Sequence, residues 1–378
     1  MEIYLDNSAT TAVSAPVMER MNAMMTANFG NPSSLHRKGF EAEQALSSAR
    51  SEVAAVLGVP GERITFTCCG SEANNLAIVG ACRARRRQGG RVITTAVEHE
   101  SVLAPVRQLG SEGFEPVFIA PNPDGTVSPA AVADAVNEHT ALVSVMHVNS
   151  ETGAVNDIPA IVSAVRRKNP NLLFHCDCVQ SFCKLPVTPL SWGADLISVS
   201  AHKIHGPKGI GALYTAKGVR LLPLYYGSGQ EKGLHPGTEN VPGICGFGLA
   251  ATQMWAKRRE NTENFRLLRR HLIENLSQIP GVCINSPEQG APYIVNFSVP
   301  AVGSEVMIHH LERYGIYLSS GSACARGARS HVLTAMGLPP VRIDGALRVS
   351  FCAENTAEQL DELTLRLREG LKTLAARR

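Results

Sequence analysis

The feature that most constrains the fold of this chain is the alternation of short apolar segments with segments of helix length. The short segments are rich in β-branched residues and cover residues 63–68, 91–95, 116–119, 141–146, 172–177, 196–200 and 211–214. Alternation of this kind predicts βαβ units, in which mostly parallel strands form a sheet with helices on both faces. The sequence therefore predicts an α/β fold with a seven-stranded sheet.

A different pattern begins near residue 244. A long helical stretch runs to residue 276 and is followed by turn signals at Pro280-Gly281 and Ser286-Pro287. Further strands are predicted at 293–299, 316–319 and 346–351, with a last amphipathic helix from residue 357. We therefore predict a large domain of residues 15–250 and a smaller α+β domain built from residues 1–14 and 251–378.

Composition narrows the class of protein. The formal charge is only +3 over 378 residues, and the basic runs at 83–87 and 166–168 fit exposed helix faces better than a nucleic-acid surface. No window approaches the roughly 20 apolar residues of a membrane span, and the N-terminus does not resemble a signal peptide. We expect a cytoplasmic protein without direct nucleic-acid or membrane contacts, whose ten cysteines form no disulfide framework.

Polar residues gather where the predicted strands end. They are Gly70-Ser71, Glu98-His99, Asn149-Ser150, Asp177 with Gln180, and Ser200-Ala201-His202-Lys203. Ligands of open α/β sheets bind beyond the carboxyl ends of the strands, so we expect one site to hold all of them. Neither the dinucleotide fingerprint nor a Walker A sequence is present, because Gly206 to Gly211 lacks the spacing and precedes a strand.

Three of these positions suggest specific chemistry. Gly70-Ser71-Glu72 before a helical run at 73–81 outlines an anion site, although a serine there is also a common helix cap. Lys203 at the mouth of a buried sheet suits a Schiff base with an aldehyde cofactor, the alternative being a solvated lysine. Asp177 at a strand end needs a cationic partner, such as a pyridinium nitrogen.

These residues belong to a larger set of motifs, which covers nearly the whole chain. The set comprises Tyr4-Leu5-Asp6-Asn7-Ser8-Ala9-Thr10-Thr11, Phe29-Gly30-Asn31-Pro32-Ser33, Glu98-His99, His147-Val148-Asn149, Asp177 with Gln180, Ser200-Ala201-His202-Lys203, Gly206-Pro207-Lys208-Gly209 and Ser319-Ser320-Gly321-Ser322-Ala323-Cys324. With this set the chain resembles the NifS/IscS group of cysteine desulfurases, within the class V aminotransferases of fold type I that depend on pyridoxal 5'-phosphate.

The resemblance implies pyridoxal 5'-phosphate as cofactor, with Lys203 as the Schiff-base lysine. Asp177 would pair with the pyridinium nitrogen, His99 would stack on the ring and be available for proton transfer, and Gln180 would bond the phenolic oxygen. The phosphate and the rest of the cofactor would be held by Gly70, Ser71, Ser150, Ser200, His202 and, from the partner subunit of a homodimer, Thr238.

The resemblance also implies the reaction. L-cysteine would be the substrate, bound by Asn149 and by a bidentate contact from Arg348 to its carboxylate. Cys324 would take the sulfur as a persulfide and pass it to an acceptor protein, such as an iron–sulfur scaffold or a tRNA-thiolation protein. A loop rich in glycine and serine around Cys324 favours this reading over a buried small residue.

The chain departs from the family at several positions. Ser150 replaces the usual second asparagine after His147-Val148-Asn149, and the loop after Cys324 is shorter than usual. Six further cysteines lie near the inferred site, at Cys68, Cys69, Cys176, Cys178, Cys183 and Cys352. Their spacing is poor for a zinc or iron–sulfur site, so we predict buried filler and no metal.

Three other functions stay open on the sequence. An aminotransferase of the same class would need no reactive thiol, and Cys324 in its Ser-Gly-Ser-Ala-Cys setting disfavours it. A selenocysteine lyase would use the same residues. A metal or iron–sulfur binding protein on the same fold would use the extra cysteines, but Lys203, Asp177 and His99 together argue for an enzyme.

Overall fold

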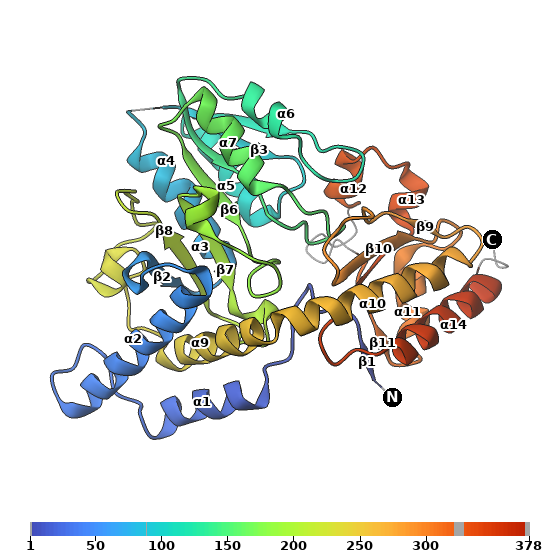
Figure 1. Ribbon diagram of the computed structural model, residues 1–378, viewed down its shortest axis with the longest axis horizontal. Helices are drawn as coiled ribbons and strands as arrows, with labels where there is room; N and C mark the ends of the chain where they lie inside the picture. Colours follow the sequence, from blue (N-terminus) through green and yellow to red (C-terminus); the bar gives the residue numbers. More distant parts are fainter. Residues whose placement is uncertain (1, 88, 321–328, 375–378) are drawn as a thin grey trace.

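The computed structural model describes residues 2–87, 89–320 and 329–374. Within these residues the large sheet has seven strands in the order β2-β8-β7-β6-β5-β3-β4 (Figure 1). β8 runs antiparallel to both neighbours, and the other adjacent pairs are parallel. The predicted mostly parallel sheet is therefore confirmed. Its strands are β2 (Ile64–Thr67), β3 (Arg91–Thr95), β4 (Glu115–Ile119), β5 (Thr140–Ser144), β6 (Leu173–Asp177), β7 (Leu196–Ser200) and β8 (Gly211–Thr215).

Adjacent residues of a strand supply opposite faces of this sheet, because side chains alternate along a strand. Leu142 of β5 packs in an apolar cluster with helix α5 (Glu100–Ser111). Val143, the next residue, packs in a second cluster with α2 (Arg37–Leu57) and α9 (Val241–Ala256). Helices thus cover both faces, which is why the strands read as continuous apolar runs.

The remaining helices of this part surround the same sheet. The predicted helix at 73–81 begins earlier, at Gly70, and contains one π-helical turn at Leu76–Gly80. Among the described residues, none of the helices combines the length and the apolar character that crossing a bilayer requires. The other helical elements are α1 (Ala15–Thr26), α3 (Gly70–Asn75), α4 (Ala81–Ala84), α6 (Pro129–Asp134), α7 (Ile158–Lys168), α8 (Pro189–Trp192) and short 3-10 turns at Gly61–Arg63, Ala201–Lys203 and Gln230–Gly233.

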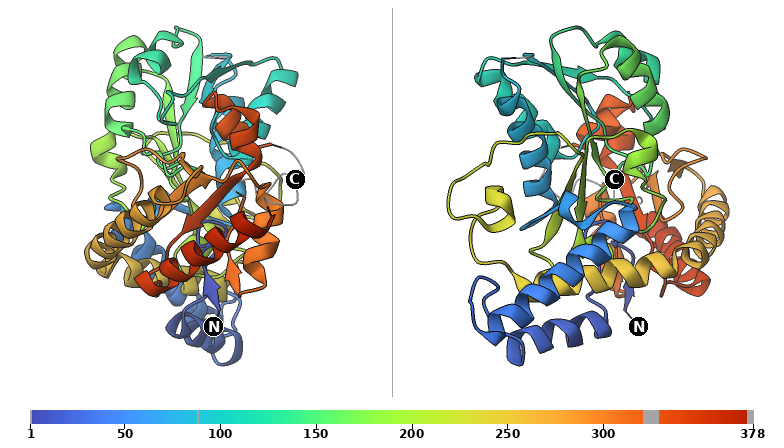
Figure 2. Two further views of the ribbon diagram at one scale, coloured as in Figure 1. Left: turned by 90° about the vertical axis from the view of Figure 1, so that its right-hand side faces the viewer. Right: turned by 60° about the vertical axis from the view of Figure 1, so that its left-hand side comes forward.

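The C-terminal elements, orange and red in Figures 1 and 2, gather on one side of the molecule. A three-stranded antiparallel sheet, in the order β12-β10-β9, is covered by helices. The first strand of the chain, β1 (Ile3–Tyr4), pairs here with β11 (Ile316–Tyr317). The elements are β9 (Cys283–Ile284), β10 (Ile294–Ser298), β12 (Ala346–Ser350), α10 (Arg258–Ser277), α11 (Ser304–Glu312), α12 (His331–Ala335), α13 (Pro340–Asp344) and α14 (Ala357–Leu374).

The long helical stretch predicted from residue 244 to 276 is two helices. α9 ends at Ala256 and α10 begins at Arg258, with Lys257 between them. α9 packs in the apolar cluster of the large sheet, whereas Phe265 and Leu268 of α10 pack in that of the small sheet. The predicted boundary at residue 250 falls within α9, so the two-domain division with these limits stays a prediction.

Candidate active site

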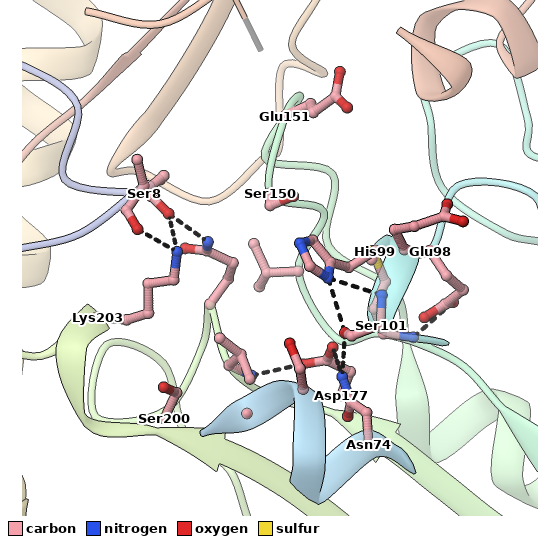
Figure 3. A pocket seen from close by; sticks show the side chains of 18 of the residues that line it. Ser8, Asn74, Glu98, His99, Ser101, Ser150, Glu151, Asp177, Ser200 and Lys203 are labelled. Atoms are coloured by element: carbon pink, nitrogen blue, oxygen red, sulfur yellow. Dashed lines mark hydrogen bonds between the residues drawn. The ribbon is translucent and has the colours of Figure 1, made fainter. Parts of the chain in front are cut away.

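A cavity of about 520 Å³ opens at the carboxyl edge of the large sheet (Figure 3). β2, β3, β5, β6 and β7 all end at this edge, and the segments that follow them meet there. Its size is in the range of small-molecule sites. The expected strand-end residues that line it are Gly70, Ser71, Glu98, His99, Ser150, Asp177, Gln180, Ser200, His202 and Lys203, joined by Arg348 from β12.

Lys203 brings an amine to the cavity wall. The residue ends the short 3-10 turn that follows β7. Its Nζ donates to the backbone oxygens of Ser8, at 2.5 Å, and Ala9, at 2.7 Å. The N-terminal segment therefore holds this amine in place, and Figure 3 shows Lys203 and Ser8 together at one side of the cavity.

Asp177 places a carboxylate at the other side of the same cavity. It is the last residue of β6 and is only 6% exposed. Its Oδ2 accepts a hydrogen bond from Nδ2 of Asn74 at 2.7 Å, and its Oδ1 accepts from the backbone N–H of Val179 at 2.9 Å. A buried carboxylate held by two donors is a well-oriented partner for a cationic ring nitrogen.

His99 begins α5 as its N-cap residue. Its Nδ1 accepts from the backbone N–H of Ser101 at 3.1 Å. Burial holds the pKa of His99 below its ordinary value of 6.5 and outweighs the opposing charge of Asp177. The imidazole at the cavity is therefore neutral near pH 7.

Val179 and Ser200 pack so closely against Gly70 that there is no space for a side chain at this position. A Cβ at this position would lie 2.8 Å from Cγ2 of Val179 and 3.2 Å from Cβ of Ser200, so only glycine lets the helix start here. The serine-cap alternative is wrong, because the cap is Cys69, whose Sγ accepts from the Glu72 N–H at 3.4 Å. Ser71 lies in the first helical turn and lines the cavity instead.

Several residues that line the cavity carry a buried polar atom with no hydrogen-bond partner within the described residues. Oγ of Ser200 and Oε1 of Gln180 are two of these atoms. Nε2 of Gln180 donates to the backbone oxygen of Ser8 at 2.9 Å, so Oε1 of the same amide points away from Ser8. Buried polar atoms of this kind are costly to leave without a partner, so a polar ligand is expected to bind them.

Asn149 does not line the cavity, although the sequence assigns it to the substrate. Its Nδ2 donates to the Val97 carbonyl, and its Oδ1 accepts from the N–H groups of Glu151 and Thr152, all at 2.9 Å. The side chain therefore shapes the turn that presents Ser150 to the cavity. A direct contact of Asn149 with substrate stays a prediction.

Arg348 reaches the cavity from β12 and is 3% exposed. Its Nη2 pairs with Oδ1 of Asp6 at 2.6 Å, and its Nη1 donates to the backbone oxygen of Ser150 at 2.9 Å. Its buried Nε has no partner within the described residues. The guanidinium is thus fixed between the two sheets and keeps a donor for an anion.

Thr238, which the sequence assigns to the cofactor phosphate, is exposed and does not line this cavity. Cys324, together with the loop at 321–328, lies outside the described residues, so its predicted role and the predicted effect of the short loop are not tested.

The six extra cysteines differ in burial, and Cys69 and Cys352 are only partly buried. Cys176, Cys178 and Cys183 are buried in the apolar core, as predicted for filler. For Cys68 that prediction is wrong, because its side chain is exposed. Within the part of the chain that the structure describes, no cluster of three or more histidine, cysteine or acidic residues is arranged to hold a metal ion.

Sequence reasoning missed several residues that complete the site. Asn74 binds Asp177, and Ser101 binds His99. A signal for Asn74 was available, because it lies one helical turn after Gly70 and so on the same face. The backbone oxygen of Ser8 and the side chain of Asp6 carried no local signal, since their partners are 195 and 342 residues away.

The sequence matches the family described as aminotransferase class-V over residues 3–363. The chain belongs to this family. Among curated relatives, "Cysteine desulfurase IscS" of Methanosarcina thermophila is 40% identical over 364 residues, covering 96% of this chain and 90% of that protein. The solved structure of a "NifS-like protein" has a TM-score of 0.94 and 36% identity and covers 98% of this chain and all of the other. "SspA in complex with cysteine" has a TM-score of 0.82 and 33% identity, with coverages of 92% and 98%.

Class-V aminotransferases use pyridoxal 5'-phosphate, and the cavity of this family member fits it. The amine of Lys203 and the carboxylate of Asp177 stand at opposite sides of one cavity. The buried Ser200 hydroxyl and Gln180 carbonyl have no protein partner within the described residues and offer polar contacts to the cofactor. Gly70 lines the cavity and has no side chain of its own to stand between its backbone and an anion.

Proposed function

We propose that this protein is a cysteine desulfurase, which converts L-cysteine to L-alanine and holds the released sulfur as a persulfide on Cys324. The observation that carries the proposal is a single cavity that combines Lys203, Asp177, His99 and Arg348 in a chain 40% identical to a desulfurase over nearly its full length. A similar solved structure contains cysteine itself, which supports L-cysteine as the ligand.

Each residue has a task that follows from its surroundings. Asp177 holds the ring nitrogen of the cofactor in its protonated form, so that the bound cofactor acts as an electron sink. Lys203 would hold the cofactor through its amine, and the same amine at the cavity wall would be the base that moves a proton at the substrate Cα. Arg348 binds the substrate carboxylate and fixes its orientation.

The sulfur step needs a thiolate. The thiolate of Cys324 attacks the substrate sulfur, an S–S bond forms while the C–S bond breaks, and the electron pair stays with the substrate carbon, which takes up a proton to become the methyl group of alanine. The sulfur then remains on Cys324 as a persulfide. We infer an acceptor protein that removes it, because the enzyme must be freed of sulfur for the next turnover.

The direct test incubates the purified, cofactor-loaded protein with L-cysteine and a thiol reductant and quantifies alanine and sulfide. Equal amounts of both products are expected. A keto acid that keeps the sulfur, 3-mercaptopyruvate, in place of alanine and sulfide would instead indicate an aminotransferase. Borohydride reduction followed by peptide mass mapping should locate the cofactor on Lys203, and an adduct on another lysine would contradict that assignment.

Cys324→Ala separates cofactor binding from sulfur transfer. The variant should keep the cofactor and its visible absorption, because Lys203 and Asp177 do not depend on the thiol, yet release almost no sulfide. Ser322→Ala in the same loop is the matched control and should retain activity. If Cys324→Ala forms sulfide and alanine at the wild-type rate, Cys324 is not the acceptor, and persulfide mapping on the wild-type protein would show which cysteine is.

We also propose a homodimer with shared active sites. Apolar side chains are exposed on α1 and on the segment that leads to α2, where Phe29 is 66% and Leu35 fully exposed. Figure 1 places these elements at one edge of the molecule. An exposed apolar surface of this kind is typical of an interface. Light scattering should give the mass of a dimer, and a fully active monomer would refute the sharing of Thr238.

A further inference from the structure

Two hydrogen-bond donors converge on one nitrogen of His99. The backbone N–H of Ser101 lies 3.1 Å from Nδ1, and the hydroxyl oxygen of the same serine lies 2.8 Å from it (Figure 3). A backbone N–H can only donate. Nδ1 must therefore accept, which places the single proton of a neutral imidazole on Nε2.

The direction of the Ser101 hydroxyl follows from Asn74. Nδ2 of Asn74 lies 2.7 Å from Oδ2 of Asp177 and 2.8 Å from Oγ of Ser101. The carboxylate accepts one amide hydrogen, so the amide nitrogen must face it, and the second amide hydrogen goes to Ser101. Because Oγ already accepts from Asn74, its own hydrogen is directed to Nδ1 of His99.

Burial of His99 acts in the same direction as this network, whereas the charges around it act in both directions. Burial is the main cause that lowers its pKa, and Lys203 and His331 lower it further, while Asp177 and Glu100 oppose them. A second proton on Nδ1 would face the hydrogens of two donors. The imidazolium is therefore disfavoured by geometry as well as by burial.

We propose that Asn74 and Ser101 are positioning residues that fix His99 as the neutral Nε2–H tautomer, so that His99 is a permanent hydrogen-bond donor to the ligand and not a proton acceptor. The ring of His99 reaches into the cavity on the side away from Ser101 (Figure 3). A neutral histidine used as a donor is a known catalytic device, and it leaves Lys203 as the base. The consequence for catalysis rests on the proposed desulfurase function, whereas the tautomer does not.

The first experiment measures the tautomer directly. The holoenzyme is labelled with 15N-histidine, and the His99 resonances are assigned by their loss in His99→Gln. Nitrogen shifts distinguish an acceptor Nδ1 from a protonated one. We expect the Nε2–H tautomer across the neutral pH range, and an imidazolium or an Nδ1–H form near pH 7 would overturn the proposal.

Ser101→Ala and Asn74→Ala test the positioning role. Removing the hydroxyl, or the amide that orients it, should raise the pKa of His99 by about 0.5 to 1, the value of one lost hydrogen bond. Ser111→Ala, on the same helix but bonded only to Gln108, is the matched control and should leave the pKa unchanged. Equal pKa values in Ser101→Ala and Ser111→Ala would refute the role, and Ser101→Thr, which keeps the hydroxyl, should restore the wild-type value.

Activity supplies an independent readout. The amide of His99→Gln can donate a hydrogen bond but cannot titrate, so this variant should keep about ten times more activity than His99→Phe. Equal losses in the two variants would contradict the donor role. A protein that shows the Nε2–H tautomer but releases no sulfide from L-cysteine would overturn the desulfurase proposal and leave the tautomer intact.

Discussion

Lys184→Met is expected to stabilise the protein, because Lys184 is a buried cation. Lys184 is 7% exposed, and its Nζ lies 4.8 Å from the ring centre of Tyr293. Burial lowers the pKa of Lys184 from its ordinary value of 10.5 to about 7, with a further contribution from the charge of Lys203. Methionine fills a similar volume without an amine to desolvate.

The magnitude follows from linkage between protonation and folding. Below pH 10.5 the unfolded state binds a proton that the folded state holds less well, so folding loses stability as the pH falls towards 7. A pKa difference of this size corresponds to about 4 to 5 kcal/mol near pH 7 and to about 1.5 kcal/mol near pH 9.5. Since methionine loses the contact with the Tyr293 ring, we expect a gain of about 2 to 4 kcal/mol near pH 7.

Urea unfolding of the cofactor-free protein near pH 7 and near pH 9.5 measures this gain. Lys217→Met is the control, because Lys217 is exposed and its removal changes the same charge. The advantage of Lys184→Met over Lys217→Met should shrink by about 2 kcal/mol or more at the higher pH. An advantage that is absent, or that is the same at both pH values, would refute the reasoning that Lys184 is penalised for its charge.

Three further changes test the surroundings of the cavity. Asp6→Asn should lower the free energy of unfolding by about 1 to 3 kcal/mol and raise KM for L-cysteine, because Arg348 loses its charged partner; unchanged urea midpoints and initial rates would contradict this. Burial raises the pKa of Glu98 from 4.5 to about 8. The free energy of unfolding of the protein should therefore fall as the pH rises between these two values. In urea unfolding, the stability of Glu98→Gln relative to the wild type should therefore grow from about pH 5 to about pH 8. A difference in stability that stays the same over this range would argue against the charge of Glu98 as its cause. Ser150→Asn should leave desulfurase activity intact or raise it, since the Ser150 contact to Arg348 is made by the backbone, whereas a loss of cofactor absorption would show a pocket rebuilt around serine.

Local patterns predicted the strands of the large sheet well, because the position of each strand along the chain follows from short-range signals. Every predicted strand is present, and strand-end residues such as Asp177 and Lys203 meet at one cavity. Parallel strands place their carboxyl ends at one edge whatever the details of packing. The candidate site could therefore be located from the sequence alone, without knowing which strands are neighbours in the sheet.

Contacts between distant segments were beyond such reasoning. Lys257 interrupts the long helical stretch but is neither glycine nor proline, so the sequence carries no signal for a break there. The break occurs where the chain passes from the core of the large sheet, which holds α9, to that of the small sheet, which holds α10. The motif did not reveal that backbone groups of Val97, Glu151 and Thr152 bond the side-chain amide of Asn149. Hydrogen-bond competition of this kind depends on the local turn and is not visible in a motif.

The N-terminal segment explains how the two sheets make one site. Asp6 fixes Arg348 of the small sheet, and two residues later the backbone oxygen of Ser8 accepts from both Lys203 and Gln180 of the large one. The backbone oxygen of Leu5 accepts in turn from the backbone N–H of Ser350, which joins this N-terminal segment to β12 of the small sheet. A group that binds the substrate carboxylate and a group that anchors the cofactor are therefore held at a fixed separation by three consecutive residues. A fixed separation of this kind is needed to orient a substrate against a cofactor. It explains why the motif at residues 4–11 belongs to a site whose cofactor lysine, Lys203, is 195 residues after Ser8.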